Sequence, residues 1–182
     1  MMNFINKGVY NLLSRFRNTE TLTLVNSVAK INDYNLIIPN LYLGNMKCAS
    51  NLNFLLEHNI QGIVNCTEHE PFHEYFNDEH KRKMRLNIND SRSKDNIAKF
   101  KSEILETINF IDDCLEENKP VFVHCYWGLM RSATVVASYL IKKYNLKADE
   151  AIFIVKTNRP YSLISFYNFN EILTFVEETY KN

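Results

Sequence analysis

The stretch from Val121 to Ser132 (VFVHCYWGLMRS) constrains the fold more than any other part of the chain. It begins with β-branched and aromatic residues, which is typical of a buried strand, and it turns at Gly128. From Arg131 onward the apolar residues follow a helical period. A strand, a tight loop and a helix N-terminus in this order predict an anion site, because the loop N–H groups converge and the helix dipole adds positive potential.

The loop in this stretch carries a thiol, Cys125, and a guanidinium, Arg131, with five residues between them. The potential that binds a phosphate also lowers the pKa of a cysteine and favours its nucleophilic thiolate form. An arginine adds a planar fork that binds two phosphoryl oxygens. The combination predicts phosphoryl transfer to sulfur. The alternative is that Cys125 is an inert thiol buried at a strand end.

The pattern His124-Cys125-x5-Arg131-Ser132 resembles the phosphate loop of cysteine-based protein phosphatases, and the surrounding chain is similar to their dual-specificity branch. The resemblance runs from about Ile37 to Glu178. It includes LYLG at Leu41–Gly44 and an A…VK..RP pattern that ends at Pro160. It implies an α/β fold with a central, mostly parallel sheet of about four to five strands flanked by helices. It also implies a cysteinyl-phosphate mechanism that needs no cofactor and no metal.

Residues 1–30 lie outside this resemblance. Apolar residues recur near a helical period between Phe4 and Phe16, which predicts a helix with one apolar face. Small viral phosphatases of the family carry an N-terminal helix that dimerises, so the similar length and placement imply a homodimer. The alternative is that the helix packs on its own domain. We therefore predict an N-terminal helical extension at 1–30 and a catalytic domain at 31–182.

The resemblance assigns a general acid to Asp90, at the end of a strand predicted at Met84–Asp90. A carboxylic acid on a nearby loop can protonate the departing oxygen of a phosphate ester. The spacing from Asp90 to Cys125 is about one helical turn longer than in familiar members. Asp95 is the competing candidate, but it fits better as the N-cap of a helix that enters at Ile97.

Two neighbours of the loop also receive roles from the resemblance. Ser132 resembles the hydroxyl that stabilises the departing thiolate by a hydrogen bond. His124 would orient the loop from behind and lower the pKa of Cys125; the alternative is a core histidine. Asn65 matches a position whose side chain braces the phosphate loop, or it is an ordinary polar residue at a strand end. Cys66 should end near Cys125, where a protective disulfide is one outcome and a buried thiol the other.

The loop side chains bear on substrate. Trp127 stands where the family often has a small residue, and Met130 stands where Ser often precedes the Arg. The loop has none of the lysines of lipid-phosphatase relatives and lacks the Thr-His pair of RNA 5′-triphosphatase relatives. The resemblance thus implies phosphotyrosine and phosphoserine/threonine proteins as substrates. The alternatives are a catalytically dead phosphopeptide-binding scaffold and an RNA 5′-phosphatase. The phosphate oxygens are assigned to the loop residues Tyr126, Trp127, Gly128, Leu129, Met130 and Arg131.

Composition narrows the setting of the protein. Lys+Arg and Asp+Glu balance at 21 each, so no global field favours nucleic acid or an anionic membrane. No apolar run reaches the length of a membrane span, and the start of the chain has no signal-peptide h-region. The four cysteines show no paired or metal-binding spacing. They indicate reduced thiols in a cytoplasmic compartment, which would be the host cytoplasm or the virion if the protein is viral.

Two polar segments leave alternatives open. His69 and His73 are four residues apart, but Pro71 between them weakens a helical metal-ligand pair. The basic run at 80–85 could recognise an acidic or nucleic-acid partner, although such runs more often form a solvated face. The remaining elements predicted are two strands around a turn at Pro39-Asn40, a strand at Gly62–Cys66, and helices at Cys48–His58, Ile97–Leu115, Ser132–Tyr144, Ala148–Asn158 and Phe166–Tyr180.

Overall fold

In a computed structural model, the structure describes residues 32–164 and 169–181. Five strands form one sheet in the order β1-β2-β5-β3-β4. β1 pairs antiparallel with β2, whereas the pairs β2/β5, β3/β5 and β3/β4 are parallel. The predicted α/β fold with a mostly parallel sheet is therefore confirmed. The strands are β1 (Tyr34–Ile38), β2 (Leu41–Asn45), β3 (Gly62–Asn65), β4 (Arg82–Arg85) and β5 (Val121–Cys125).

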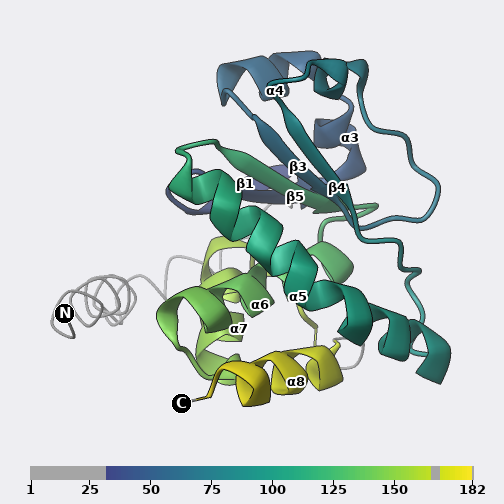
Figure 1. Cartoon of the computed structure of the whole chain (residues 1–182), viewed down its shortest axis with the longest axis vertical. Helices are drawn as coiled ribbons and strands as arrows, with labels where there is room; N and C mark the ends of the chain where they lie inside the picture. The colour runs from purple at the N-terminus through teal and green to yellow at the C-terminus, as the bar shows by residue number, and fades with distance from the viewer. Residues whose placement is uncertain (1–31, 165–168, 182) are drawn as a thin grey trace, which may run out of the picture. The chain divides into compact units, whose positions relative to one another are not determined.

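Helices cover both faces of the sheet (Figure 1). Phe122 of β5 packs in one cluster with Phe54 and Leu55. Because side chains alternate along a strand, Val121, Val123 and Cys125 face the opposite side, where α5 and α6 contact the strands. All five residues of β5 are buried, as expected for a central strand covered twice. The helices are α3 (Met46–Ala49), α4 (Leu52–Glu57), α5 (Lys94–Glu116), α6 (Arg131–Tyr144), α7 (Ala148–Asn158) and α8 (Asn170–Tyr180).

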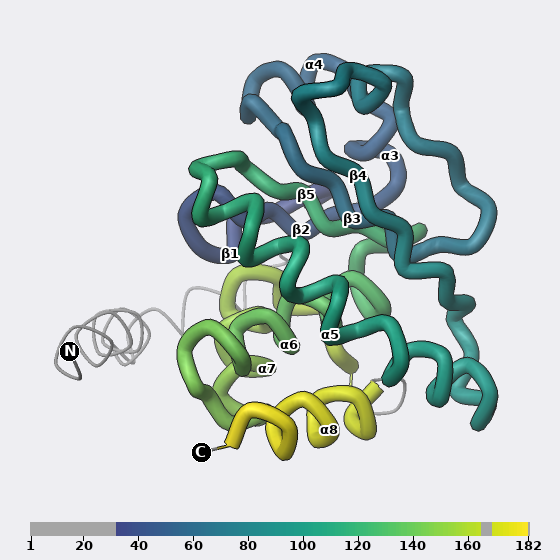
Figure 2. Tube along the Cα trace, viewed as in Figure 1, coloured from purple at the N-terminus to yellow at the C-terminus, as the bar shows by residue number. Residues whose placement is uncertain are grey.

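The parallel strands end at one edge of the sheet, and this edge carries the polar residues of interest. The register pairs Asn45 of β2 with Cys125 of β5, and Asn65 of β3 with His124. In the Cα trace, the chain leaves β5 at this edge and returns as α6 beneath the sheet (Figure 2). Ligands of open α/β sheets bind at the carboxyl ends of the strands. The fold thus places the Cys125 loop where such sites occur.

The prediction of one continuous helix at Cys48–His58 is wrong. The chain forms two short helices, α3 and α4, separated at Ser50 and Asn51. The Asn51 side chain accepts hydrogen bonds from the N–H groups of Asn53 and Phe54, so it caps a new helix. Two leucines of α4, Leu52 and Leu56, are 43% and 57% exposed despite their apolar side chains.

The strand predicted at Met84–Asp90 is wrong in its limits. β4 covers Arg82–Arg85, and the chain then leaves the sheet before Asp90, with Leu86 and Ile88 still buried. The next helix, α5, begins at Lys94 rather than Ile97. Its N-cap is Ser93, whose side chain accepts from the N–H of Asn96, and Asp95 lies in the first turn. The N-cap assignment of Asp95 is therefore corrected to Ser93.

The basic run at 80–85 is largely engaged within the domain. Arg82 contacts Glu117 and Asp113, and Lys81 contacts Asp78. Arg85 donates to the carbonyls of Thr67 and Glu70. These contacts favour a structural role over an acidic partner.

The last predicted helix is only partly described. The helix expected at Phe166–Tyr180 begins at Asn170, and residues 165–168 lie outside the described part of the chain, as do 1–31 with the predicted extension. Among the helices that the structure describes, none combines the length and apolar character needed to cross a membrane.

Candidate active site

The loop between β5 and α6 (residues 125–131, the phosphate loop) packs closely against the end of β2. Gly128 has φ +68°, and a Cβ there would lie 2.2 Å from the carbonyl oxygen of Gly44. The N–H of Met46 donates to the carbonyl of Tyr126 at 3.2 Å. Met130, which precedes α6, provides no side-chain cap. The Met130 side chain therefore does not occupy the first-turn N–H groups of α6, which remain available as hydrogen-bond donors.

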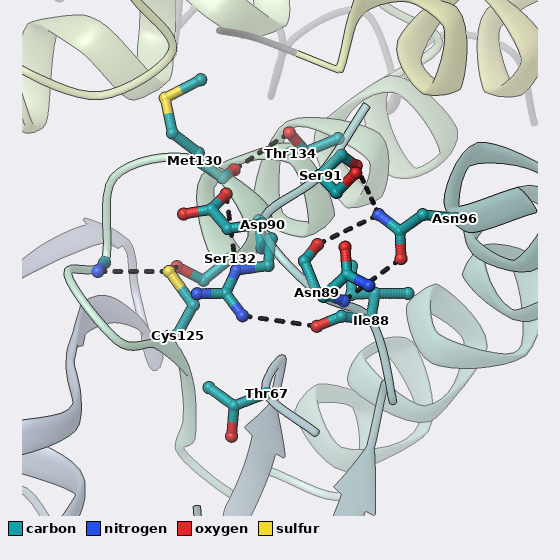
Figure 3. Close-up of polar contacts among 12 residues, drawn as sticks. Thr67, Ile88, Asn89, Asp90, Ser91, Asn96, Cys125, Met130, Ser132 and Thr134 are labelled. Carbon is teal, nitrogen blue, oxygen red and sulfur yellow. Dashed lines mark hydrogen bonds and ion pairs between the residues drawn. The ribbon is translucent and has the colours of Figure 1, made fainter. Parts of the chain in front are cut away.

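Cys125 is the first residue of this loop, and Figure 3 shows its side chain. Its side chain is buried, and its Sγ accepts hydrogen bonds from the N–H of Gly128 and from Oγ of Ser132, both at 3.2 Å. The structure thus brings Ser132 to Cys125, where its predicted role requires it.

Arg131 is buried at the start of α6 and lies beside the loop that carries Asp90. Its Nε lies 3.6 Å from Oδ1 of Asp90, and its Nη1 donates to the carbonyl of Ile88 at 3.3 Å. The Asp90 side chain is about half exposed. The guanidinium, the thiol and the carboxylic acid therefore share one site, despite the longer spacing in sequence.

Arg159 holds the phosphate loop from its outer side. This buried guanidinium donates to the carbonyls of Gly128 at 2.6 Å and Trp127 at 3.3 Å. It also donates to the carbonyl of Asn32 and to Oδ1 of Asn35. When loop carbonyls point to Arg159, the adjoining N–H groups are free to point inward. Sequence reasoning noted Arg159 only as part of an RP pattern, because its partners are distant in the sequence.

Arg159→Lys should therefore weaken both stability and turnover. An ammonium cannot reproduce a planar fork with four acceptors, and an unpaired buried carbonyl is left behind. We expect a loss of about 3 kcal/mol in the free energy of unfolding and a severalfold lower kcat. Urea denaturation and steady-state kinetics measure the two effects. The control Arg82→Lys, at a partly exposed ion pair with Glu117, should change neither; equal effects of both variants would contradict the proposed brace.

His124 is buried behind the loop and stacks on Phe122, with ring centroids 5.7 Å apart. Burial lowers its pKa to about 3, so the ring is neutral near neutral pH. A neutral imidazole adds no positive charge beside Cys125. Its contribution there is packing, and both ring nitrogens lack a well-formed hydrogen bond among the described residues.

Three further residues that the sequence singled out, two as neighbours of the loop and one as a possible metal ligand, are also described by the structure. Asn65 bonds to Thr67 and to the carbonyl of Glu70, so it shapes the turn after β3 and does not brace the phosphate loop. Cys66 is a free thiol, and burial raises its pKa well above the ordinary value. His73 accepts from the N–H of Tyr75 and caps a short 3-10 helix, Glu74–Asn77. In the described ranges, no cluster of His, Cys, Asp and Glu could hold a metal.

The side chains of the loop are largely turned outward. Tyr126 is 44% and Trp127 65% exposed, and their rings meet edge to face at 5.1 Å. Leu129 and Met130 are partly buried, and the carbonyl of Leu129 accepts from the N–H of Leu163. Because the Trp127 ring projects to solvent, its bulk does not fill the loop.

Comparison with known proteins agrees with this geometry. Residues 41–178 match the family described as dual specificity phosphatase, catalytic domain. Human dual specificity protein phosphatase 9 is 36% identical over 140 residues, and human dual specificity protein phosphatase 6 is 35% identical over 139. Each match covers 76% of this chain and 35% of the relative. The crystal structure of human DUSP28 superposes with a TM-score of 0.71 at 21% identity, covering 83% of this chain and 97% of that one.

The chain belongs to the dual-specificity phosphatase family. It spans about a third of the length of the curated relatives named above. The likeness to the solved structure supports the fold.

Proposed function

We propose that the protein is a phosphatase that removes phosphate from phosphotyrosine and phosphoserine/threonine residues of proteins. The observation that carries the proposal is the cluster of Cys125, Ser132, Arg131 and Asp90 at one end of the sheet. These four groups are the nucleophile, the thiolate-stabilising hydroxyl, the oxyanion clamp and the acid that phosphate-ester cleavage needs.

The first step is transfer of the phosphoryl group to sulfur. The Cys125 thiolate attacks phosphorus in line, and the bond from phosphorus to the ester oxygen breaks. The loop N–H groups and Arg131 hold the three equatorial oxygens, where the negative charge resides throughout. Asp90 gives its proton to the departing alcohol or phenol. The distance of 3.6 Å between Asp90 Oδ1 and Arg131 Nε supports this role.

The second step releases phosphate from the cysteinyl-phosphate. Water attacks phosphorus, and Asp90, now a carboxylate, takes its proton. The sulfur leaves as a thiolate, and the Ser132 hydroxyl that donates to Sγ stabilises it. No metal or cofactor enters this scheme.

A phosphopeptide-binding scaffold is the rival, and turnover separates the two. The test is hydrolysis of p-nitrophenyl phosphate and of phosphotyrosyl and phosphothreonyl peptides by reduced protein with EDTA present. We expect metal-independent turnover that vanadate inhibits. Binding of the phosphopeptides without turnover between pH 5 and 8 would instead favour the scaffold, and turnover of RNA 5′-phosphates alone would favour the RNA phosphatase.

Asp90→Asn should slow turnover of substrates with poor leaving groups by about 100-fold, since a positioned general acid contributes roughly 10²–10⁴. KM should change little, because the loop N–H groups and Arg131 that hold the phosphate oxygens are unchanged. Asp95→Asn is the matched control, on the exposed first turn of α5. A comparable loss in Asp95→Asn would transfer the acid role to that residue.

Two finer expectations remain proposals. Four free, buried cysteines support a reducing, cytoplasmic compartment, because oxidising compartments favour disulfides. Dimerisation through residues 1–30 rests on the apolar period and on the resemblance to the N-terminal helix of small viral phosphatases. Sedimentation of the full chain and of a variant lacking residues 1–30 tests it: a dimer that persists in the shortened chain would contradict this role.

A further inference from the structure

The loop that carries Asp90 has neither helix nor strand between Leu86 and Ser93. One side chain nevertheless holds its backbone on both sides of Asp90. The Asn96 side chain makes three hydrogen bonds to this loop (Figure 3). Its Oδ1 accepts from the N–H of Asn89 at 3.1 Å. Its Nδ2 donates to the carbonyl of Asn89 at 3.0 Å and to the carbonyl of Ser91 at 2.6 Å.

These contacts engage both the N–H groups and the carbonyl of the buried Asn96 side-chain amide. Asn96 is 6% exposed, and the amide has two N–H donors and one carbonyl acceptor, all of which are engaged. The residues it holds, Asn89 and Ser91, lie on either side of Asp90. The backbone is thus fixed immediately before and after the acid, while the Asp90 side chain points toward the thiol (Figure 3).

The side chain that holds the loop is itself anchored. Asn96 lies in the first turn of α5, and its own N–H donates to the N-cap Ser93. α5 packs against α6, which begins at Arg131. The acid loop and the phosphate loop are therefore both positioned relative to the same pair of helices.

We propose that Asn96 is a positioning residue that holds Asp90 at the distance and orientation required for proton donation. The inference rests on the proposed phosphatase function. Nothing in it requires Asn96 to touch the substrate. Asn96 affects turnover only through Asp90. The loss of turnover on its substitution should therefore be larger for substrates that need more proton donation from the acid.

Leaving-group chemistry provides the test. p-Nitrophenol is a much stronger acid than phenol, so its phosphate ester needs little proton donation, whereas phenyl phosphate needs it fully. Displacing the acid should therefore slow phenyl phosphate far more than p-nitrophenyl phosphate. Damage to the fold or to the phosphate cradle should slow both substrates by the same factor.

The experiment measures kcat/KM for both esters in wild type, Asn96→Ala and Asn96→Asp. Asn96→Asp keeps an acceptor for the Asn89 N–H but has no donor for the two carbonyls. We expect both variants to raise the preference for p-nitrophenyl phosphate by roughly tenfold. Thr107→Val is the control, since it removes a partly buried hydrogen bond to the carbonyl of Glu103 on the same helix, away from the site. It should leave the preference unchanged.

A second arm uses Asp90→Asn as background. If Asn96 acts through the acid, adding Asn96→Ala to Asp90→Asn should not lower turnover of phenyl phosphate further. An additive loss, or an unchanged preference in both single variants, would overturn the positioning role while leaving the phosphatase intact. A wild-type protein without turnover of either ester would overturn both. Asn96→Asp preserves the inference should Asn96→Ala fail to fold, because it retains one of the three bonds.

Discussion

Cys125→Ser should abolish turnover, with a fall in kcat of roughly 10⁴-fold or more, as expected for loss of a covalent nucleophile. The change replaces one buried atom. A hydroxyl oxygen can still accept from the N–H of Gly128 and from Ser132, so the loop should keep its conformation. A hydroxyl is far less acidic than a thiol and provides no nucleophile at neutral pH. Steady-state hydrolysis of p-nitrophenyl phosphate measures the effect.

The variant should still bind a phosphopeptide, because the loop amides and Arg131 remain; titration calorimetry checks this. Cys114→Ala is the matched control. Cys114 is also a free, buried thiol. It lies on α5 beside Gly62 and Val121, which begin β3 and β5, whereas Cys125 ends β5. The Cys114→Ala variant should therefore keep wild-type kcat. Substantial turnover by Cys125→Ser would contradict the cysteinyl-phosphate scheme at its first step.

Gly128→Ala should have the second largest effect. At φ +68°, an L-residue is strained, and the added Cβ would lie 2.2 Å from the oxygen and 2.3 Å from the carbon of the Gly44 carbonyl. Both are backbone atoms of a buried strand, so relief requires the phosphate loop itself to move. We expect a loss of about 2–4 kcal/mol in unfolding free energy. Turnover should fall by about 100-fold, since displaced N–H groups no longer fit the equatorial oxygens.

Gly62→Ala is the control for this prediction. Its Cβ would meet side-chain atoms, Sγ of Cys114 at 3.1 Å and Cγ2 of Val121 at 3.2 Å, and these can shift slightly. It should destabilise the protein by about 1 kcal/mol and leave kcat unchanged. Urea denaturation and kinetics compare the two variants. If Gly128→Ala kept full activity, the close packing of loop and strand would not be required for catalysis.

The sheet and the phosphate loop were predictable because their signals are local. A buried apolar strand, Gly128 and the helical period after Arg131 lie in one short stretch, and each favours the same structure. The cysteine and arginine within it predicted the site. The strand predicted at Gly62–Cys66 is observed as β3 (Gly62–Asn65), which pairs in parallel with β5.

The end of β4 could not be predicted from pattern. Leu86 and Ile88 are buried while Asn87 and Asn89 are exposed, which is the alternation of a strand. The chain nevertheless leaves the sheet after Arg85. Its backbone groups bond instead to side chains from other elements: Ile88 to Arg131, and Asn89 and Ser91 to Asn96. These partners are distant or separated by a loop, so alternation alone cannot distinguish them from a strand ladder.

The residue at which a helix begins was the second feature that could not be predicted from the sequence. Ser93 and Asp95 are both good N-cap residues, and a shift of two positions changes which one begins α5. The buried Asn96 decides it, because its side chain must reach the acid loop. At Asn51, a single side chain likewise divided an apolar segment into two helices.

The contacts of Arg159 have a consequence for the order of folding. Its hydrogen bond to Asn32 spans 127 positions, and the same side chain bonds to Gly128, 31 positions away. During synthesis, β5 and the nucleophile emerge before Arg159 does. The catalytic loop therefore lacks its brace until the chain beyond α7 is made, and the closure of such distant contacts is a late step. Assembly of the nucleophile site is thereby tied to completion of the domain.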